Sequence, residues 1–201
     1  SMANLMEQVS VLKKKGIERI IIHDSMFNAQ LTHLQEFCFQ IQKQFGCVPW
    51  EAQIGIRTDM SKELISLLKA SGAYHLFIGL ESGSDKTLLR MNKGYTTSEA
   101  LLFFRLLKEN GLSFGISLIV GYPGETEEDF QESLNFILRN KELIPKIEQI
   151  NPFVYYPGIP FPSGEYGKPA PEALKKTHQF IKAVKEAGIK TTNAFLCNLV
   201  Y

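Results

Sequence analysis

Hydrophobic and polar residues along the chain alternate between two periods, one typical of helices and one typical of strands. Apolar positions at helical spacing predict helices over Asn4–Lys15, Ala29–Phe45, Ser61–Ser71, Thr97–Asn110, Glu127–Asn140 and Pro171–Ala187. Short apolar runs between them predict strands over Arg19–Asp24, Gln53–Asp59, His75–Glu81, Ser113–Gly121 and Ile147–Tyr155. Such alternation is typical of strand–helix units that build a mostly parallel sheet.

The ends of several predicted helices carry signals of their own. Thr96 and Glu99 fit a capping box, and three carboxylates follow Thr126 in the first turn of the next helix, where the helix dipole favours negative charge. Glycines follow four of the helical stretches, as left-handed C-terminal caps do. These glycines are Gly16, Gly72, Gly111 and Gly188.

The predicted strands have two unlike faces, because alternate side chains point to opposite sides of a sheet. One face is branched and apolar, and we expect the helices to pack there. The other face is small or polar and carries Arg57, Glu81, Ser117, Gln149 and Asn151. That face is too polar for a dry core, so it predicts the wall of a ligand cavity rather than a filled, closed barrel.

Polar residues also gather where the strands end. The segments concerned are 23–25, 57–59, 81–85 and 121–126. In barrel-like and doubly wound folds, the carboxyl ends of the strands are the place of binding and chemistry. The sequence therefore predicts a site at this rim.

Two rim segments have a structural and a functional interpretation. Ser82 or Ser84 could cap the following helix, but an inward-facing Glu81 needs a partner, either Arg57 or the cationic group of a zwitterionic ligand. The turn at residues 121–126 could be plain loop geometry, or its glycines could bring bare backbone against a flat ligand.

Composition and charge exclude several classes of protein. The 22 basic and 21 acidic side chains leave a net charge of +1, which gives no electrostatic reason to expect nucleic acid or an anionic membrane as a partner. The apolar runs are short, and no signal peptide is evident. We therefore expect a globular protein of a reducing cytoplasm.

The cysteines and histidines do not predict a metal site or a nucleophile. Cys38, Cys47 and Cys197 have neither zinc nor iron–sulfur spacing, and Cys38 falls on the apolar stripe of its helix. The four histidines are dispersed over strands and helices, and no G-x-S-x-G motif is present. We expect neither a catalytic nucleophile nor a metal ligand in this chain.

Five segments in a fixed order carry a resemblance to a known family. They are Gly16–Phe27, Ile56–Asp59, Ile78–Asp85 with the following Leu89–Tyr95, Ile119–Thr126, and Tyr156–Phe161. Together they resemble the radical S-adenosylmethionine (SAM) superfamily, and in particular the branch whose members often carry a cobalamin-binding domain. The Glu-Ser-Gly-Ser and Gly-Tyr-Pro-Gly-Glu-Thr blocks, in this order and spacing, make the resemblance specific.

The resemblance implies a partial (β/α) barrel of the TIM type that binds SAM at the carboxyl ends of its strands. It implies that a [4Fe–4S] cluster cleaves SAM reductively to a deoxyadenosyl radical, with a reductant such as ferredoxin or flavodoxin. In the branch named above, cobalamin is a further cofactor that the resemblance implies for the parent protein. The SAM-binding residues it implies are Asp24, Ser25, Arg57, Glu81, Ser82, Ile119, Val120, Gly121 and Asn151. Tyr155 and Tyr156 would face a small-molecule or peptide substrate.

The chain also departs from the family pattern. It lacks the C-x3-C-x2-C cluster loop, and His23-Asp24-Ser25 stands where Gly-Gly-Glu is usual. We therefore expect residues 3–162 to be a truncated core without the cluster loop, with residues 1–2 left from a tag and residues 163–201 forming a helix and an extended segment. We expect an open parallel sheet of about five strands, helices on its outer face, and an unpaired edge at Arg19–Asp24.

Two other interpretations stay open at this point. One is a cluster-free barrel enzyme, a lyase or hydrolase that uses Glu81 or Asp24 as a base. The other is a non-catalytic module that kept the barrel for binding.

Overall fold

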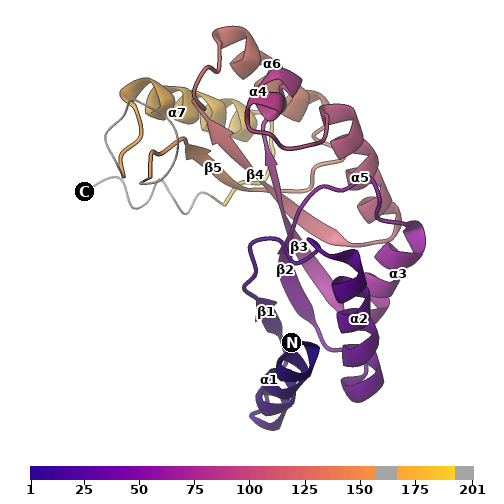
Figure 1. The fold of residues 1–201 in the computed structure, drawn as a ribbon. Coiled ribbons are helices and arrows are strands. Elements are labelled where there is room, and N and C mark those ends of the chain that lie inside the picture. The colour runs from indigo at the N-terminus through magenta and orange to yellow at the C-terminus, as the bar shows by residue number, and fades with distance from the viewer. Residues whose placement is uncertain (157–166, 193–201) are drawn as a thin grey trace. The chain divides into compact units, whose positions relative to one another are not determined.

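The computed structural model describes residues 1–156 and 167–192 (Figure 1). The chain divides into two compact units. Unit 1 comprises residues Ser1–Ile78 and Leu101–Phe114, and unit 2 comprises Gly79–Ala100 and Gly115–Tyr201. Strands and helices alternate along both, as the hydrophobic pattern predicts.

The elements follow one another in the order expected for strand–helix units. The helices are α1 (Met2–Lys14), α2 (Leu31–Phe45), α3 (Lys62–Ser71), α4 (Asp85–Arg90), α5 (Thr97–Glu109), α6 (Glu127–Arg139) and α7 (Pro171–Glu186). The strands are β1 (Ile20–Ile22), β2 (Trp50–Ile54), β3 (Ala73–Glu81), β4 (Ser113–Val120) and β5 (Ile147–Pro152).

The strands form one five-stranded sheet in the order β1-β2-β3-β4-β5. β1 pairs with β2, β2 with β3 and β4 with β5, all in parallel. β1 and β5 stand at the two ends of this order, so the sheet is open, as predicted for an incomplete barrel. Over the described residues, β2 is the one strand that pairs with β1.

Most predicted boundaries are confirmed to within a few residues, but the second strand is not. The sequence pattern predicts Gln53–Asp59, whereas β2 spans Trp50–Ile54. The side-chain amide of Asn28 takes both backbone groups of Gly55, donating to its carbonyl at 2.8 Å and accepting from its N–H at 2.7 Å. Because those groups are no longer free to pair with a strand, β2 ends before Gly55.

The core of unit 1 is built on an aromatic cluster under β2. Phe37 of α2 and Phe27 meet the ring of Trp50 edge-on, at centroid distances of 5.4 and 6.0 Å. Trp50 is fully buried, and its indole N–H donates to the hydroxyl of Ser71 at 3.1 Å. α2 packs against both α1 and α3. Aromatic burial of this kind is a large contribution to the stability of the unit.

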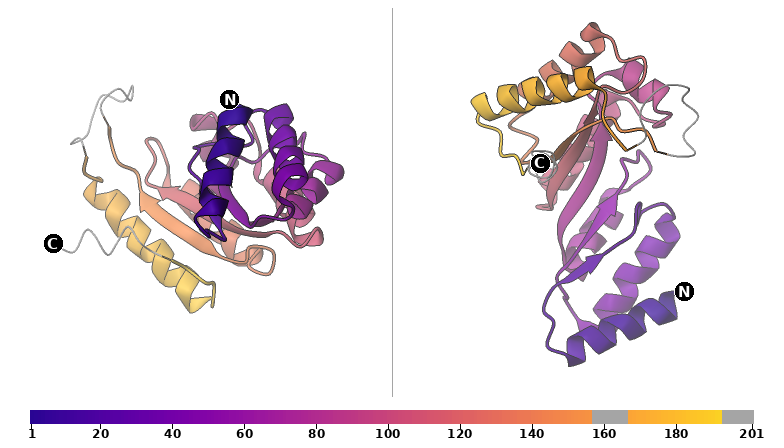
Figure 2. Two further views of the ribbon diagram at one scale, coloured as in Figure 1. Left: turned by 90° about the horizontal axis from the view of Figure 1, so that it is seen from below. Right: turned by 90° about the vertical axis from the view of Figure 1, so that its left-hand side faces the viewer.

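In unit 2, α7 lies along β5, as Figures 1 and 2 show. α7 also packs against α6, where the rings of Phe130 and Phe180 meet edge-on at 5.9 Å. The capping box of α6 is present, with Thr126 accepting from the Asp129 N–H at 3.1 Å and Asp129 accepting from the Thr126 N–H at 3.0 Å. This cap fixes the start of α6 directly after the turn that follows β4.

Candidate functional site

In unit 1, the first predicted site residues follow β1. Asp24 and Ser25 are exposed, and the Asp24 carboxylate accepts the backbone N–H of Met26 at 3.1 Å. Such a bond closes an Asx turn and so fixes the direction in which the chain leaves the strand. The structure therefore places both residues at the carboxyl end of β1, as the sequence predicts.

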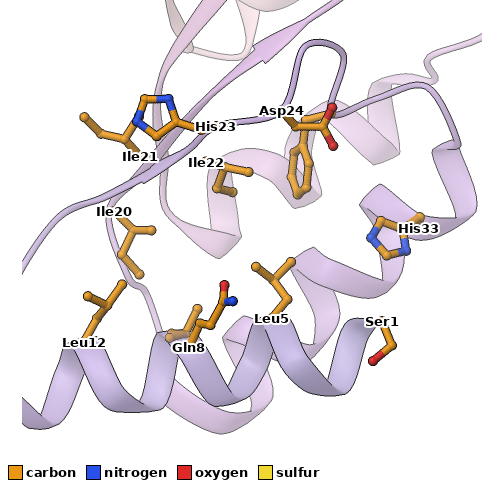
Figure 3. A pocket seen from close by; sticks show the side chains of 12 residues that line it. Ser1, Leu5, Gln8, Leu12, Ile20, Ile21, Ile22, His23, Asp24 and His33 are labelled. Atoms are coloured by element: carbon orange, nitrogen blue, oxygen red, sulfur yellow. The ribbon is translucent and has the colours of Figure 1, made fainter.

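A pocket of about 510 Å³ lies beside this loop, between α1 and β1. Figure 3 shows Leu5 and Leu12 of α1 pointing toward Ile20 and Ile22 of β1. Asp24 lies at one end of the pocket. The pocket is thus mainly apolar along its length, where Gln8 of α1 adds one amide, and it is polar at the end that holds Asp24. Neither the size nor the position of this pocket was predicted, because it depends on how α1 packs beside β1.

Arg57 lies in the loop after β2, and its partners are local. It forms two bonds with the Asp59 carboxylate, at 2.8 and 2.6 Å, and donates to the carbonyl of Ala29 at 2.9 Å. These bonds raise the pKa of Arg57 and lower the pKa of Asp59. Of the two partners that the sequence offers for Glu81, Arg57 instead binds the carboxylate of Asp59, two residues along the chain.

In unit 2, Glu81 is the last residue of β3 and pairs with Lys93. Its carboxylate lies 3.3 Å from the Lys93 ammonium, and the two side chains are 14% and 33% exposed. Glu81 also has a backbone φ of +65°, a conformation that residues with a Cβ rarely adopt. Lys93 was not singled out as a site residue, although it belongs to the Leu89–Tyr95 block of the resemblance.

The serines after Glu81 form hydrogen bonds within their own loop and to side chains of α6 rather than capping α4. The Ser82 hydroxyl accepts the Ser84 N–H at 3.1 Å, and the Ser84 hydroxyl donates to Glu132 at 2.8 Å. Ser84 is the residue before α4 but makes no side-chain cap bond, so the expected serine cap is wrong. Ser82 and Ser84 are both buried, which fixes the loop after β3.

An ion pair ties α4 to α6 beneath this loop. The buried Asp129 carboxylate accepts from Arg90 at 2.7 Å and, as above, from the Thr126 N–H. Burial alone would raise the pKa of Asp129, but the bonds from Thr126 and Arg90 outweigh it and lower that pKa to about 2.

The low pKa of Asp129 predicts a pH-dependent stability. A carboxyl whose folded pKa lies below its unfolded value stabilises the fold fully above the unfolded pKa, near 4, and loses that contribution as the pH falls toward 2. Asp129→Asn is expected to lower the free energy of unfolding by roughly 2 kcal/mol at pH 7, and by much less near pH 2.5. Urea unfolding at both pH values measures this, with the exposed Glu128→Gln as control; an equal loss at both would contradict it.

At the end of β4, the groups available to the candidate site are backbone groups rather than side chains. Val120 is buried, Ile119 is half-buried on the other face, and the Val120 carbonyl accepts the Phe153 N–H at 2.8 Å. The Gly121 N–H donates to the Glu125 carboxylate at 2.8 Å, and burial raises the pKa of Glu125. The space where a Cβ of Gly121 would lie is filled by Ala173 of α7. The bare backbone of Gly121 therefore serves the packing of α7.

Asn151, on β5, has a buried acceptor without a partner. Its amide nitrogen donates to Gln149 at 3.2 Å, while its Oδ1 is buried and makes no hydrogen bond to the described residues. A buried acceptor left in this state costs free energy unless a ligand or water satisfies it. This is the feature of the site that best fits a bound polar ligand such as SAM.

The two tyrosines after β5 differ in environment. The ring of Tyr155 meets that of Phe153 edge-on at 5.0 Å, and Phe153 in turn meets Tyr122 at 5.1 Å. Tyr156 is 57% exposed. Their expected role toward a substrate stays a prediction. Residues 157–161 of the last resemblance segment lie outside the described residues.

The residues present do not fit a [4Fe–4S] cluster. Cys38 is buried in α2, where burial raises the pKa of its thiol to about 11, and Cys47 is exposed in the next connection. A cluster needs several converging thiolates. Over the described ranges, no three Cys, His, Asp or Glu side chains are grouped to hold a metal ion. Cys197 lies outside those ranges.

Comparison with known proteins defines the class of the chain. The model of the Radical SAM superfamily matches residues 1–137, more than half of the sequence. The chain belongs to the radical SAM superfamily. Members of this family are enzymes that use SAM together with a [4Fe–4S] cluster. This membership does not favour a cluster-free lyase or hydrolase, or a non-catalytic module.

Among curated proteins, relatives include enzymes that modify tRNA. The chain is 36% identical over 142 residues to the threonylcarbamoyladenosine tRNA methylthiotransferase MtaB of Aquifex aeolicus, covering 68% of this chain and 33% of that protein. It is 34% identical over 182 residues to the tRNA-2-methylthio-N(6)-dimethylallyladenosine synthase of Natranaerobius thermophilus, covering 84% and 39%. The chain thus spans less than half the length of these relatives.

Solved radical SAM enzymes share the fold. Coproporphyrinogen III oxidase (HemN) of Escherichia coli matches with a TM-score of 0.66 and 17% identity, over 86% of this chain and 41% of that one. The cobalamin-dependent enzyme OxsB, with aqua-cobalamin and SAM bound, matches with a TM-score of 0.62 and 18% identity, over 94% and 26%. These likenesses support the open, partial barrel.

Across the part of the chain that the structure describes, none of the helices has the length and apolar character needed to cross a membrane.

Proposed function

We propose that this chain is the SAM-binding core of a radical SAM enzyme. In such an enzyme, a bound [4Fe–4S] cluster supplies the electron that cleaves SAM to a deoxyadenosyl radical. The described residues lack a ligand set for the cluster, so the part assigned to this chain is to bind and orient SAM. The alternatives raised from the sequence have no comparable support.

The observation that carries this proposal is the polar end of the sheet in unit 2. Glu81 and Lys93 form a carboxylate–ammonium pair there, and Asn151 keeps a buried acceptor without a partner. SAM bears an ammonium, a carboxylate, ribose hydroxyls and an adenine amine. A pair of opposite charges complements its zwitterionic end, and an amide oxygen accepts from a hydroxyl or an amine.

The other predicted contacts remain part of the proposal on weaker support. Asp24, Ser25 and Arg57 lie at the carboxyl ends of β1 and β2, where the family resemblance implies SAM contacts. Ser82, Ile119, Val120 and Gly121 lie at the corresponding ends of β3 and β4. At Val120 and Gly121, the packing leaves backbone rather than side chain for such a contact.

Calorimetric titration of the chain with SAM tests the proposal directly. We expect saturable binding at one site, competition by S-adenosylhomocysteine, and no competition by methionine or ATP at equal concentration. The test needs neither cluster nor turnover. Absence of SAM binding at millimolar concentration would contradict the proposed function.

The complete reaction needs more than this chain, and we propose it for a protein that adds the C-x3-C-x2-C segment. Reconstituted without oxygen, with SAM and reduced ferredoxin or flavodoxin, such a protein should form deoxyadenosine above a Cys→Ala control. The family generally needs a reductant. Cobalamin is a further cofactor to test, since OxsB and the radical SAM methyltransferase TsrM of Kitasatospora setae bind it.

A second substrate class follows from the relatives. The proposal from the sequence is a small molecule or a peptide, and the curated relatives are named for the modification of adenosines in tRNA. The near-neutral charge of this chain gives no separate reason to expect RNA. Adding tRNA to the deoxyadenosine assay distinguishes the classes, because a true substrate increases the SAM consumed.

A further inference from the structure

The backbone at the end of β3 is held in an unusual turn. The Ser82 N–H donates to the Leu80 carbonyl at 2.8 Å across Glu81, whose φ is +65°. A bond between residues two apart with a positive φ at the centre is a γ-turn of the rare, strained kind. Strain of this sort persists only where surrounding groups hold it in place.

The side chain of Tyr95 binds the two strand residues that precede Glu81. The Tyr95 hydroxyl lies 3.0 Å from the carbonyl of Gly79 and 3.0 Å from the carbonyl of Leu80. It therefore donates to a pair of adjacent carbonyls, one of which also accepts the bond that closes the turn. Burial, followed by the charge of Glu81, raises the pKa of Tyr95, so the hydroxyl keeps its proton at neutral pH.

The carboxylate of Glu81 is held from the same segment. Lys93, two residues before Tyr95, pairs with it at 3.3 Å. Two residues earlier on the same strand, a Cβ at Gly79 would overlap the Glu81 carboxylate, so that carboxylate lies over the bare backbone of Gly79. The segment Lys93–Tyr95 thus contacts Glu81 through its charge and supports its backbone through two carbonyls.

We infer that Tyr95 is a positioning residue that holds Glu81 in its strained turn, so that the carboxylate is set for SAM before SAM binds. The inference rests on the proposed function for the role of Glu81. A phenylalanine would fill the same space, so the hydroxyl and its two carbonyl acceptors carry the effect.

A double-mutant cycle tests the turn without any ligand. Tyr95→Phe is expected to lower the melting temperature by about 3 to 6 °C in the wild-type background. In a Glu81→Gly background we expect a larger shift, because glycine adopts a positive φ without strain, so relief of strain no longer offsets the lost hydrogen bonds. Equal shifts in the two backgrounds would show that the hydroxyl stabilises the fold without acting on Glu81, and would overturn the inference.

SAM titration of the same variants provides the functional test. Tyr95→Phe is expected to weaken SAM binding about tenfold, because the loss of a hydrogen bond that positions Glu81 costs about as much free energy as a tenfold change in affinity. Tyr74→Phe is the matched control, because Tyr74 lies at the other end of β3 and donates to Glu51 at 2.6 Å. The control should lose stability and keep its SAM affinity.

The outcomes separate this inference from the proposed function. If the wild-type chain does not bind SAM, the proposed function fails, while the melting-temperature cycle still decides whether Tyr95 holds Glu81. If the wild type binds SAM and Tyr95→Phe binds it equally well, the positioning role is wrong and the proposed function stands.

Discussion

Glu81→Gln is expected to weaken SAM binding by about 10- to 100-fold, which corresponds to the roughly 1.5–3 kcal/mol of a hydrogen bond to a charged group. The substitution keeps the size of the side chain but removes the negative charge that pairs with Lys93. It leaves Lys93 with a neutral neighbour and SAM without a carboxylate partner. Calorimetric titration with SAM measures the loss.

A surface glutamate provides the control for this prediction. Glu172→Gln removes one carboxylate from α7, where the side chain is 67% exposed and pairs with Lys175 at 4.0 Å. Exposed pairs of this kind contribute little, so neither SAM affinity nor stability should change. Unchanged SAM affinity in Glu81→Gln would remove Glu81 from the proposed site.

The second large effect is expected at Gly121. A Cβ there would lie 2.8 Å from the Cα of Ala173 and would overlap the Cβ of that residue. Gly121 also has a φ of +78°, which disfavours any residue with a side chain. Gly121→Ala therefore forces α7 away from the turn after β4, and we expect a loss of about 3 kcal/mol from strain and overpacking together.

Gly124 is the matched control, because it separates the two causes. Its φ is +81°, yet the nearest atoms to an added Cβ would be those of the Arg90 side chain at 3.6 Å, an ordinary contact. Gly124→Ala should cost only the conformational part, about 1–2 kcal/mol. Urea unfolding measures both, and Ala173→Gly should recover part of the loss in Gly121→Ala; equal losses at the two glycines would rule out the overlap with α7.

Much of the fold could be predicted because the signals are local. Capping residues such as Thr96 and Thr126 mark helix starts wherever they occur, and Gly72 ends α3 in the left-handed conformation that the sequence pattern implies. Successive strands lie side by side because a helical crossover joins each strand to its parallel neighbour. On β5, Gln149 is exposed and Asn151 is half-buried, while Ile150 between them is buried, as the alternation predicts.

The errors come from contacts between residues distant in sequence. Nothing near Gly55 indicates that the Asn28 amide, 27 residues earlier, takes its backbone bonds and ends β2. The structure also selects another partner for Glu81 than Arg57, and here the contacts are local in sequence. The sequence pattern shows only that Arg57 has the charge needed to pair with Glu81. In the structure, the loops bring Arg57 next to Asp59 and Lys93 next to Glu81.

The pairing of Asn28 with Gly55 has a consequence for how the sequence of this protein can evolve. Because a side chain rather than a neighbouring strand terminates β2, the loop that carries Arg57 begins outside the ladder of the sheet. Insertions or exchanges in that loop leave the strand register untouched. The side chains at this rim can therefore diverge between related proteins while the sheet itself is unchanged.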